Sequence, residues 1–160
     1  MWSFGDEMGH SKQGIRNTHN LPNAGLIDWS KQQSFADLLQ FASKLNAFRA
    51  SMPHFAYQRG LSSQDITWVM PNEDKSLSAS AVGFSLRPPM GTPGRKKMPE
   101  ILVLMNSHPT RTATFKLPRS GDWKVIADGE SLLFDNQGLR TAAGTYNVKP
   151  GTGIILSKNP

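Results

Sequence analysis

The chain has 160 residues, enough for one or two compact domains with a real core. It contains no cysteine, so disulfide frameworks, thiolate zinc sites and cysteine nucleophiles are excluded. Its formal net charge of +6 is compatible with nucleic acid or anionic lipid as a partner, if the basic residues cluster.

The 18 Lys and Arg residues are scattered along the chain, and Arg95-Lys96-Lys97 is the one basic run. Proline and glycine precede this run in residues 88–94, which favours an exposed, solvated loop over a binding patch. Residues 1–20 are polar and carry neither a signal-type apolar region nor a stretch long enough to cross a bilayer. We therefore expect no nucleic-acid partner, no membrane partner and no secretion signal in this chain.

One amphipathic helix is predicted over residues 34–49. Ser34 followed by Asp37 resembles a capping box in which Asp replaces the usual Glu, and Pro53 lies beyond the C-terminal end. Apolar residues recur at helical spacing and form a stripe that must pack on something. The stripe consists of Phe35, Leu38, Leu39, Ala42, Leu45 and Phe48.

The second half of the chain is predicted to be all-β. Short runs of β-branched and apolar residues alternate with Gly, Pro, Asn and Asp, and their close spacing favours an antiparallel sandwich. The predicted strands cover residues 66–69, 79–86, 101–106, 112–117, 123–127, 132–134, 145–148 and 153–156.

Two carboxylates and an imidazole, Asp6, Glu7 and His10, lie among glycines near the start of the chain. This arrangement suits a tight turn that displays polar groups at a strand end. Adjacent carboxylates alternate faces on a strand, so spacing alone favours a capping or loop role over a catalytic pair. The four histidines show no paired spacing and no nearby ligand cluster, which argues against a metal site.

The four tryptophans are candidates for stacking on sugar rings, since each offers a broad apolar face and an N–H donor. Trp68 and Trp123 lie within predicted strands, where core packing is favoured. Trp29 lies in a loop before the predicted helix, where stacking and packing are about equally supported. Trp29 is therefore the best stacking candidate.

Several short motifs, taken in order, resemble the isoamylase-type starch and glycogen debranching enzymes of the α-amylase superfamily, glycoside hydrolase family 13. The similarity is greatest to the plant and algal isoamylase 3 type and extends over nearly the whole chain. The motifs are Gly5-Asp6-Glu7-Met8-Gly9-His10-Ser11, then Asn17, Asn23 and Ile27-Asp28-Trp29, then Ile66-Thr67-Trp68, Val103-Leu104-Met105-Asn106-Ser107-His108, Trp123-Lys124-Val125-Ile126-Ala127-Asp128 and Tyr146-Asn147-Val148.

The resemblance implies the last βα unit of a (β/α)8 TIM barrel, followed by an all-β C-terminal antiparallel β-sandwich. Residues 1–56 would hold the exit of strand eight, a cleft loop and helix eight, and residues 57–160 the sandwich. Active sites of such barrels lie at the C-terminal ends of the strands. The resemblance therefore places residues of the early loop in the substrate cleft, namely Asp6, Glu7, His10, Asn17 and Trp29.

The function implied is hydrolysis of α-1,6-glucosidic branch points in branched α-glucan such as starch, glycogen or limit dextrin. The family's three catalytic carboxylates belong to earlier strands and are expected upstream of Met1, so this chain alone is expected to be inactive and to hold no catalytic residue. No cofactor and no metal are implied. The location implied is the plastid stroma in a plant or alga and the cytoplasm in a bacterium.

One alternative stays open. The loop around Asn17 departs from the family pattern, with Ile15-Arg16 before it and Leu21-Pro22 where the family often has an acidic residue. Such drift also occurs in non-catalytic isoamylase-like subunits that bind glucan and assemble with an active partner. Other isoamylase subunits, assembled with this protein in a homo- or hetero-oligomer, are therefore also candidate partners.

Overall fold

The structure is a computed structural model, and it describes residues 5–12, 14–17, 20–21, 23, 26–57, 59–72, 80–119, 121–128 and 141–159. The chain divides into two compact units, Met1–Arg49 and Ala50–Pro160, and each is described by itself. The predicted strand at residues 132–134 and part of the predicted strand at 79–86 lie outside the described residues.

The described residues of the first unit form two short 3-10 turns and all but the last two residues of the helix α1. The turns are η1 (Asp6–Met8) and η2 (Trp29–Gln32), and α1 runs from Ala36 to Ser51, so the predicted helix is confirmed with both ends shifted by two residues. Ala42 is buried, whereas Phe35 and Leu38 of the predicted stripe are each 36% exposed. Among the described residues, no helix is both long and apolar enough to cross a membrane.

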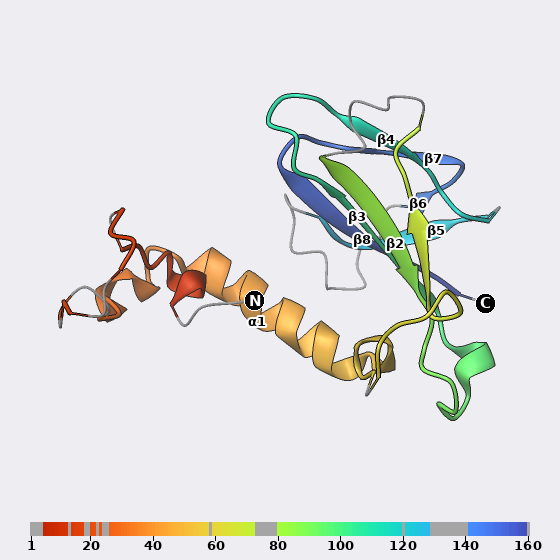
Figure 1. Cartoon of the computed structure of the whole chain (residues 1–160), viewed down its shortest axis with the longest axis horizontal. Coiled ribbons are helices and arrows are strands. Elements are labelled where there is room, and N and C mark those ends of the chain that lie inside the picture. Colours follow the sequence, from red (N-terminus) through yellow and green to blue (C-terminus); the bar gives the residue numbers. More distant parts are fainter. Residues whose placement is uncertain are drawn as a thin grey trace. The chain divides into compact units, whose positions relative to one another are not determined.

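The second unit is built from antiparallel strands in two sheets. A six-stranded sheet has the order β1-β2-β3-β8-β5-β6, and β4 pairs with β7 in a second sheet (Figure 1). Two 3-10 turns, η3 (Pro53–Phe55) and η4 (Arg95–Lys97), lie before β1 and between β2 and β3. The strands are β1 (Ile66–Val69), β2 (Ala81–Leu86), β3 (Glu100–Asn106), β4 (Ala113–Lys116), β5 (Trp123–Asp128), β6 (Thr141–Ala142), β7 (Thr145–Val148) and β8 (Thr152–Lys158).

The sequence located seven of these eight strands, and it missed β6. This strand has only two residues, Thr141 and Ala142, and pairs with the start of β5. Two residues are too few to produce the alternation by which a strand is recognised in a sequence. The coarse prediction of a mostly antiparallel β domain after one helix is confirmed, while the barrel origin of the first unit stays a prediction.

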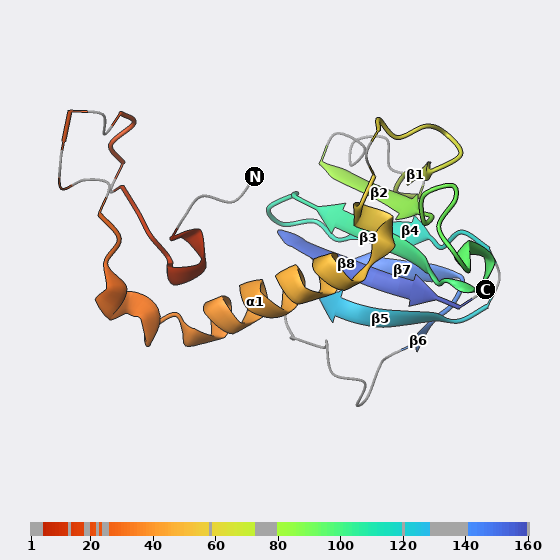
Figure 2. The same ribbon diagram turned by 90° about the horizontal axis from the view of Figure 1, so that it is seen from below.

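The core of the second unit lies between its two sheets. Alternate residues of β3, β5 and β8 point inward, and β4 and β7 cover that face (Figure 2). Trp123 and Phe115 are the largest side chains without solvent exposure. Each removes roughly 150–250 Å² of mostly apolar surface from water, so these two rings are the largest single contributors to the hydrophobic stabilisation of the unit. Among the described residues of this unit, twelve buried ones form this core: Ala81, Leu102, Leu104, Ala113, Phe115, Leu117, Trp123, Val125, Ala142, Val148, Ile154 and Leu156.

A buried amide closes one end of this core. Asn106, the last residue of β3, is 1% exposed, and its Nδ2 lies 2.8 Å, 3.0 Å and 3.2 Å from the carbonyl oxygens of Arg111, Val148 and Lys149. Its Oδ1 accepts a hydrogen bond from the backbone N–H of His108 at 3.0 Å. One side chain therefore ties the β3–β4 connection to the end of β7.

A buried carboxylate anchors the entry to β1. Asp65 is 1% exposed and accepts a bidentate pair of hydrogen bonds from Arg59 at 2.8 Å and 3.0 Å. The backbone N–H and hydroxyl of Ser62 also donate to it, at 2.9 Å and 2.6 Å. The Arg59 guanidinium, followed by the two Ser62 donors, holds the pKa of Asp65 far below its usual range.

We expect Asn106→Ala to lower the free energy of unfolding by about 2–4 kcal/mol. The substitution leaves the buried carbonyl group of Val148 without its partner and removes the hydrogen bonds to Arg111, Lys149 and His108. The matched control is Asn147→Ala in β7. Asn147 is exposed and its side chain accepts one hydrogen bond, from Thr114, so the loss should stay near 0.5 kcal/mol. Urea unfolding of both variants measures the difference, and equal losses would contradict the role assigned to Asn106.

We expect Asp65→Asn to lower stability most at neutral pH. A carboxylate whose folded pKa is depressed stabilises the fold above its unfolded pKa of about 3.9, and that contribution is lost as the pH falls further. The difference in unfolding free energy between wild type and Asp65→Asn should therefore be constant from about pH 5 to pH 8 and shrink below about pH 4. Urea unfolding at several pH values tests this, and a difference that does not change with pH would refute it.

Candidate functional site

The acidic motif near the start of the chain folds as a closed turn. Gly5 and Gly9 flank η1 with φ of 99° and 64°, a left-handed conformation that glycine adopts without strain. The carbonyl oxygen of Gly5 accepts hydrogen bonds from the N–H groups of Met8 at 2.9 Å and His10 at 3.0 Å. As the sequence predicts, Asp6 is displayed on the exposed side of a tight turn, while Met8 is buried beneath it.

This turn packs against the segment that carries Trp29. A Cβ atom added to Gly9 would lie 2.6 Å from Cζ of Phe35, and one added to Gly5 would lie 3.4 Å from Cγ1 of Ile27. Ile27 and Phe35 flank η2 in the sequence, and η1 and η2 lie against each other. The absence of side chains at Gly5 and Gly9 therefore lets the acidic turn approach η2 closely.

Asp28 fixes the start of η2. Its Oδ1 accepts hydrogen bonds from the backbone N–H of Ser30 at 3.1 Å and from the Ser30 hydroxyl at 2.5 Å. These hydrogen bonds, the side-chain one first, lower the pKa of Asp28. Between the two capping partners lies Trp29, whose side chain is 61% exposed. An aromatic ring is thus held outward on a capped turn.

A groove of about 800 Å³ is lined by residues of this turn and by residues of α1 from Ala36 to Lys44. Trp29 lies in its wall, with Ala36 and Leu39 as further apolar lining. Sugars combine apolar ring faces with a rim of hydroxyl groups, so a cleft with one aromatic face and several amide and hydroxyl groups has the chemistry to bind them. The polar lining residues are Ser30, Gln32, Gln33, Gln40, Ser43 and Lys44.

The five predicted site residues lie in three places within the first unit. Trp29 lines the groove, Asp6, Glu7 and His10 belong to the neighbouring turn, and Asn17 is an exposed loop residue. The structure thus brings the acidic turn beside the tryptophan segment but does not gather all five side chains in one cavity. In the part of the chain that the structure describes, no three His, Asp or Glu residues form a group able to hold a metal ion.

Sequence reasoning missed the three glutamines of the groove. Gln32 and Gln33 follow Trp29 directly, and Gln40 lies two turns later on α1. The signal available was the polar run Ser30-Lys31-Gln32-Gln33 beside an exposed aromatic residue. A single polar run is common on protein surfaces, so only the fold shows that these amides share one groove with Trp29.

No family model matches the chain. Over 183 aligned positions it is 24% identical to the glycogen operon protein GlgX homolog of Mycobacterium bovis and equally similar to that of Mycobacterium tuberculosis H37Rv. Each alignment covers 99% of this chain and 25% of the relative. The chain thus spans about a quarter of the length of the curated relatives it matches.

Solved structures of pullulanases share its fold. The pullulanase from Bacillus acidopullulyticus matches with a TM-score of 0.73 and 25% identity, over 96% of this chain and 18% of that one. The type I pullulanase from Bacillus subtilis, solved with maltose, matches with a TM-score of 0.74 and 17% identity, over 98% and 20% of the two chains.

The narrower similarity to plant and algal isoamylases stays a prediction. The broader resemblance seen in the sequence is confirmed, since the relatives found by sequence and the structures found by fold agree over nearly the whole chain. The chain is therefore related to the debranching enzymes of the α-amylase family.

Proposed function

We propose that the chain is the C-terminal part of a glycoside hydrolase that cleaves α-1,6-glucosidic branch points in glycogen- or starch-like glucan. One observation carries the proposal: 99% of the chain aligns with only a quarter of a glycogen operon protein, while its fold matches a fifth of a pullulanase. Both relatives are thus much longer than this chain and contain a similar segment.

In this proposal the bond-cleaving groups belong to the rest of the enzyme. Retaining glycoside hydrolysis needs a nucleophilic carboxylate and an acid/base carboxylate roughly 5–5.5 Å apart across the scissile bond. Asp6 and Glu7 are adjacent residues of one short turn, Asp6 exposed and Glu7 half-buried, so we assign them to binding and orientation. The 160-residue chain by itself is then inactive towards glucan.

The groove beside Trp29 is the proposed glucan-contacting surface of this chain. Trp29 stacks on a glucose ring, and the groove amides of Gln32, Gln33 and Gln40 donate to and accept from its hydroxyl groups. Asp6, Glu7, His10 and Asn17 are proposed to supply further polar contacts to the glucan. None of these roles requires a cofactor.

Exposed apolar side chains on α1 and in the segment before it support the view that more protein covers this unit in the enzyme. Phe35 and Leu38 are each 36% exposed, and Leu26 is 65% exposed in the loop before η2. The described residues of this unit form one helix and two short turns, which offer little apolar surface to bury these side chains against. The further elements of a barrel would supply that surface.

The groove is tested by the binding of maltooligosaccharide to the 160-residue chain, measured by titration calorimetry. We expect Trp29→Ala to weaken binding about five- to tenfold, which corresponds to about 1–1.4 kcal/mol of lost stacking. Trp68→Ala is the matched control, since Trp68 is also 61% exposed but lies on β1 in the other unit. It should change the affinity less than twofold.

The same titration tests the acidic turn. Glu7→Gln should weaken binding two- to fivefold because an ionised carboxylate is a stronger acceptor for sugar hydroxyls than an amide. The control is Asp37→Asn, because Asp37 is an acid in the first turn of α1 that does not line the groove, and this variant should leave the affinity unchanged.

Loss of binding in Trp68→Ala but not in Trp29→Ala would move the glucan site out of the groove and contradict this part of the proposal.

A further inference from the structure

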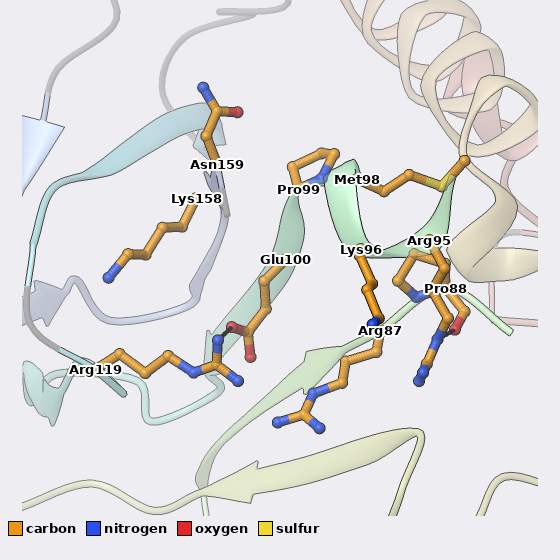
Figure 3. A pocket seen from close by; sticks show the side chains of 10 residues that line it. All are labelled: Arg87, Pro88, Arg95, Lys96, Met98, Pro99, Glu100, Arg119, Lys158 and Asn159. Carbon is orange, nitrogen blue, oxygen red and sulfur yellow. Dashed lines mark hydrogen bonds and ion pairs between the residues drawn. The ribbon is translucent and has the colours of Figure 1, made fainter. Parts of the chain in front are cut away.

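A second cavity, in the unit of antiparallel strands, has a strongly basic lining. It has a volume of about 590 Å³, and five of its ten lining residues are Arg or Lys, while one is an acid. The basic residues come from three separate parts of the sequence: Arg87, Arg95 and Lys96 between β2 and β3, Arg119 after β4, and Lys158 at the end of β8 (Figure 3).

Sheet pairing is what brings these residues together. Glu100 at the start of β3 lies opposite Lys158 at the end of β8, and Leu86 at the end of β2 lies opposite Ile101. The end of β2, the start of β3 and the end of β8 therefore lie side by side at one end of the sheet. The sequence favoured a solvated loop for Arg95-Lys96-Lys97, and Lys96 and Lys97 are indeed exposed. Arg95 and Lys96 also line the cavity, whereas Lys97 does not.

The backbone on both sides of the β2–β3 connection is fixed. The N–H of Arg87 donates to the carbonyl oxygen of Asp65 at 3.1 Å, and the Tyr57 hydroxyl donates to the carbonyl oxygen of Arg87. At the other end, Nε2 of the buried His54 lies 2.7 Å from the carbonyl oxygen of Pro99. A carbonyl oxygen can only accept, so Nε2 of His54 carries the hydrogen of this bond. Burial lowers the pKa of His54.

Individual basic side chains are also oriented. Nε of Arg95 donates to the carbonyl oxygen of Pro88 at 2.7 Å. Nζ of Lys158 lies 5.9 Å from the ring centroid of Trp123, and Nε1 of Trp123 donates to the carbonyl oxygen of Pro118 at 3.1 Å. The cavity wall is therefore organised before any ligand enters, which lowers the entropic cost of binding.

Arg119 carries backbone strain. Its φ is 64°, and within the described ranges it is the one residue other than glycine with a positive φ. Such a conformation is strained for a residue other than glycine and tends to persist where it places a side chain for function. Here it directs the guanidinium to the carboxylate of Glu100, with 3.5 Å between Nη1 and Oε2 (Figure 3).

We propose that this cavity binds a phosphate monoester carried by a glucose unit. Several Arg and Lys donors around one space match the charge and the three oxygens of a phosphate group, and guanidinium groups bind such oxygens in pairs. Pro88, Met98 and Pro99 add an apolar wall suited to a sugar ring, and the volume lies within the range of small-molecule sites. That the ligand is a glucose derivative rests on the function proposed above.

Calorimetric titration of the 160-residue chain with glucose 6-phosphate tests the site, with glucose and inorganic phosphate as reference ligands. We expect glucose 6-phosphate to bind at least tenfold more tightly than either. Arg87→Gln should weaken its binding about tenfold, whereas Lys97→Gln, in the same loop but outside the lining, should change it less than twofold. Equal binding by Arg87→Gln and wild type, or no binding of glucose 6-phosphate, would overturn the proposal.

Arg119→Gly separates binding from folding. Glycine accepts a φ of 64° without strain, so the melting temperature should not fall, while the affinity for glucose 6-phosphate should fall about tenfold. A purely structural Arg119 would give a lower melting temperature and unchanged affinity, and that result would contradict the assigned role.

The source of the phosphate is distinguished by co-sedimentation with phosphorylated amylopectin and with the same glucan after phosphatase treatment. Stronger retention on the phosphorylated glucan identifies the polymer as the ligand, and equal retention identifies a free sugar phosphate. Arg87→Gln should leave the binding of neutral maltooligosaccharide unchanged, and Trp29→Ala should leave the binding of glucose 6-phosphate unchanged. Failure of one proposal is thereby distinguished from failure of the other.

Discussion

The pairing of β3 with β8 organises everything described in the second unit. Seven residues of each strand are in register, from Glu100 opposite Lys158 to Asn106 opposite Thr152. Between these ends the inward residues Leu102, Leu104, Ile154 and Leu156 form the centre of the core. At one end the pairing brings acidic and basic side chains to the edge of a cavity, and at the other it places a buried amide where three carbonyl groups converge.

The hydrogen bonds of the buried Asp65 stabilise the fold and also position one residue of the basic cavity. Asp65, satisfied by Arg59 and Ser62, presents its own carbonyl oxygen to the N–H of Arg87. A buried carboxylate is tolerated because its charge is paired and its oxygens accept several hydrogen bonds. The same network that allows Asp65 to be buried therefore fixes the backbone of Arg87, a cationic residue of the cavity.

The first unit differs from the second, since the apolar face of its helix is only partly covered and an exposed tryptophan lines its polar groove.

The fold could be predicted from the sequence wherever the pattern was local. The strand at 66–69 and the strand at 145–148 have the predicted bounds, and the helix differs by two residues at each end. The glycine-flanked acidic turn was also predicted, because the need for a left-handed backbone conformation is visible in Gly5 and Gly9. The groove glutamines and the basic cavity could not be predicted. The glutamines meet only because α1 lies beside η2, and the cavity residues meet only through the register of the strands. The basic run at 95–97 shows this, because its partners Arg119 and Lys158 are distant in sequence.

The central claim, that the chain is the C-terminal part of a branch-cleaving glycoside hydrolase, is tested most directly by the sequence of the transcript that encodes it. The account predicts an open reading frame that continues upstream of Met1, encodes the earlier strands of a barrel and carries the nucleophilic, acid/base and stabilising carboxylates on three of them. A frame without these carboxylates would contradict hydrolysis and favour the non-catalytic, glucan-binding subunit. A frame with a stop codon directly before Met1 would contradict the claim itself.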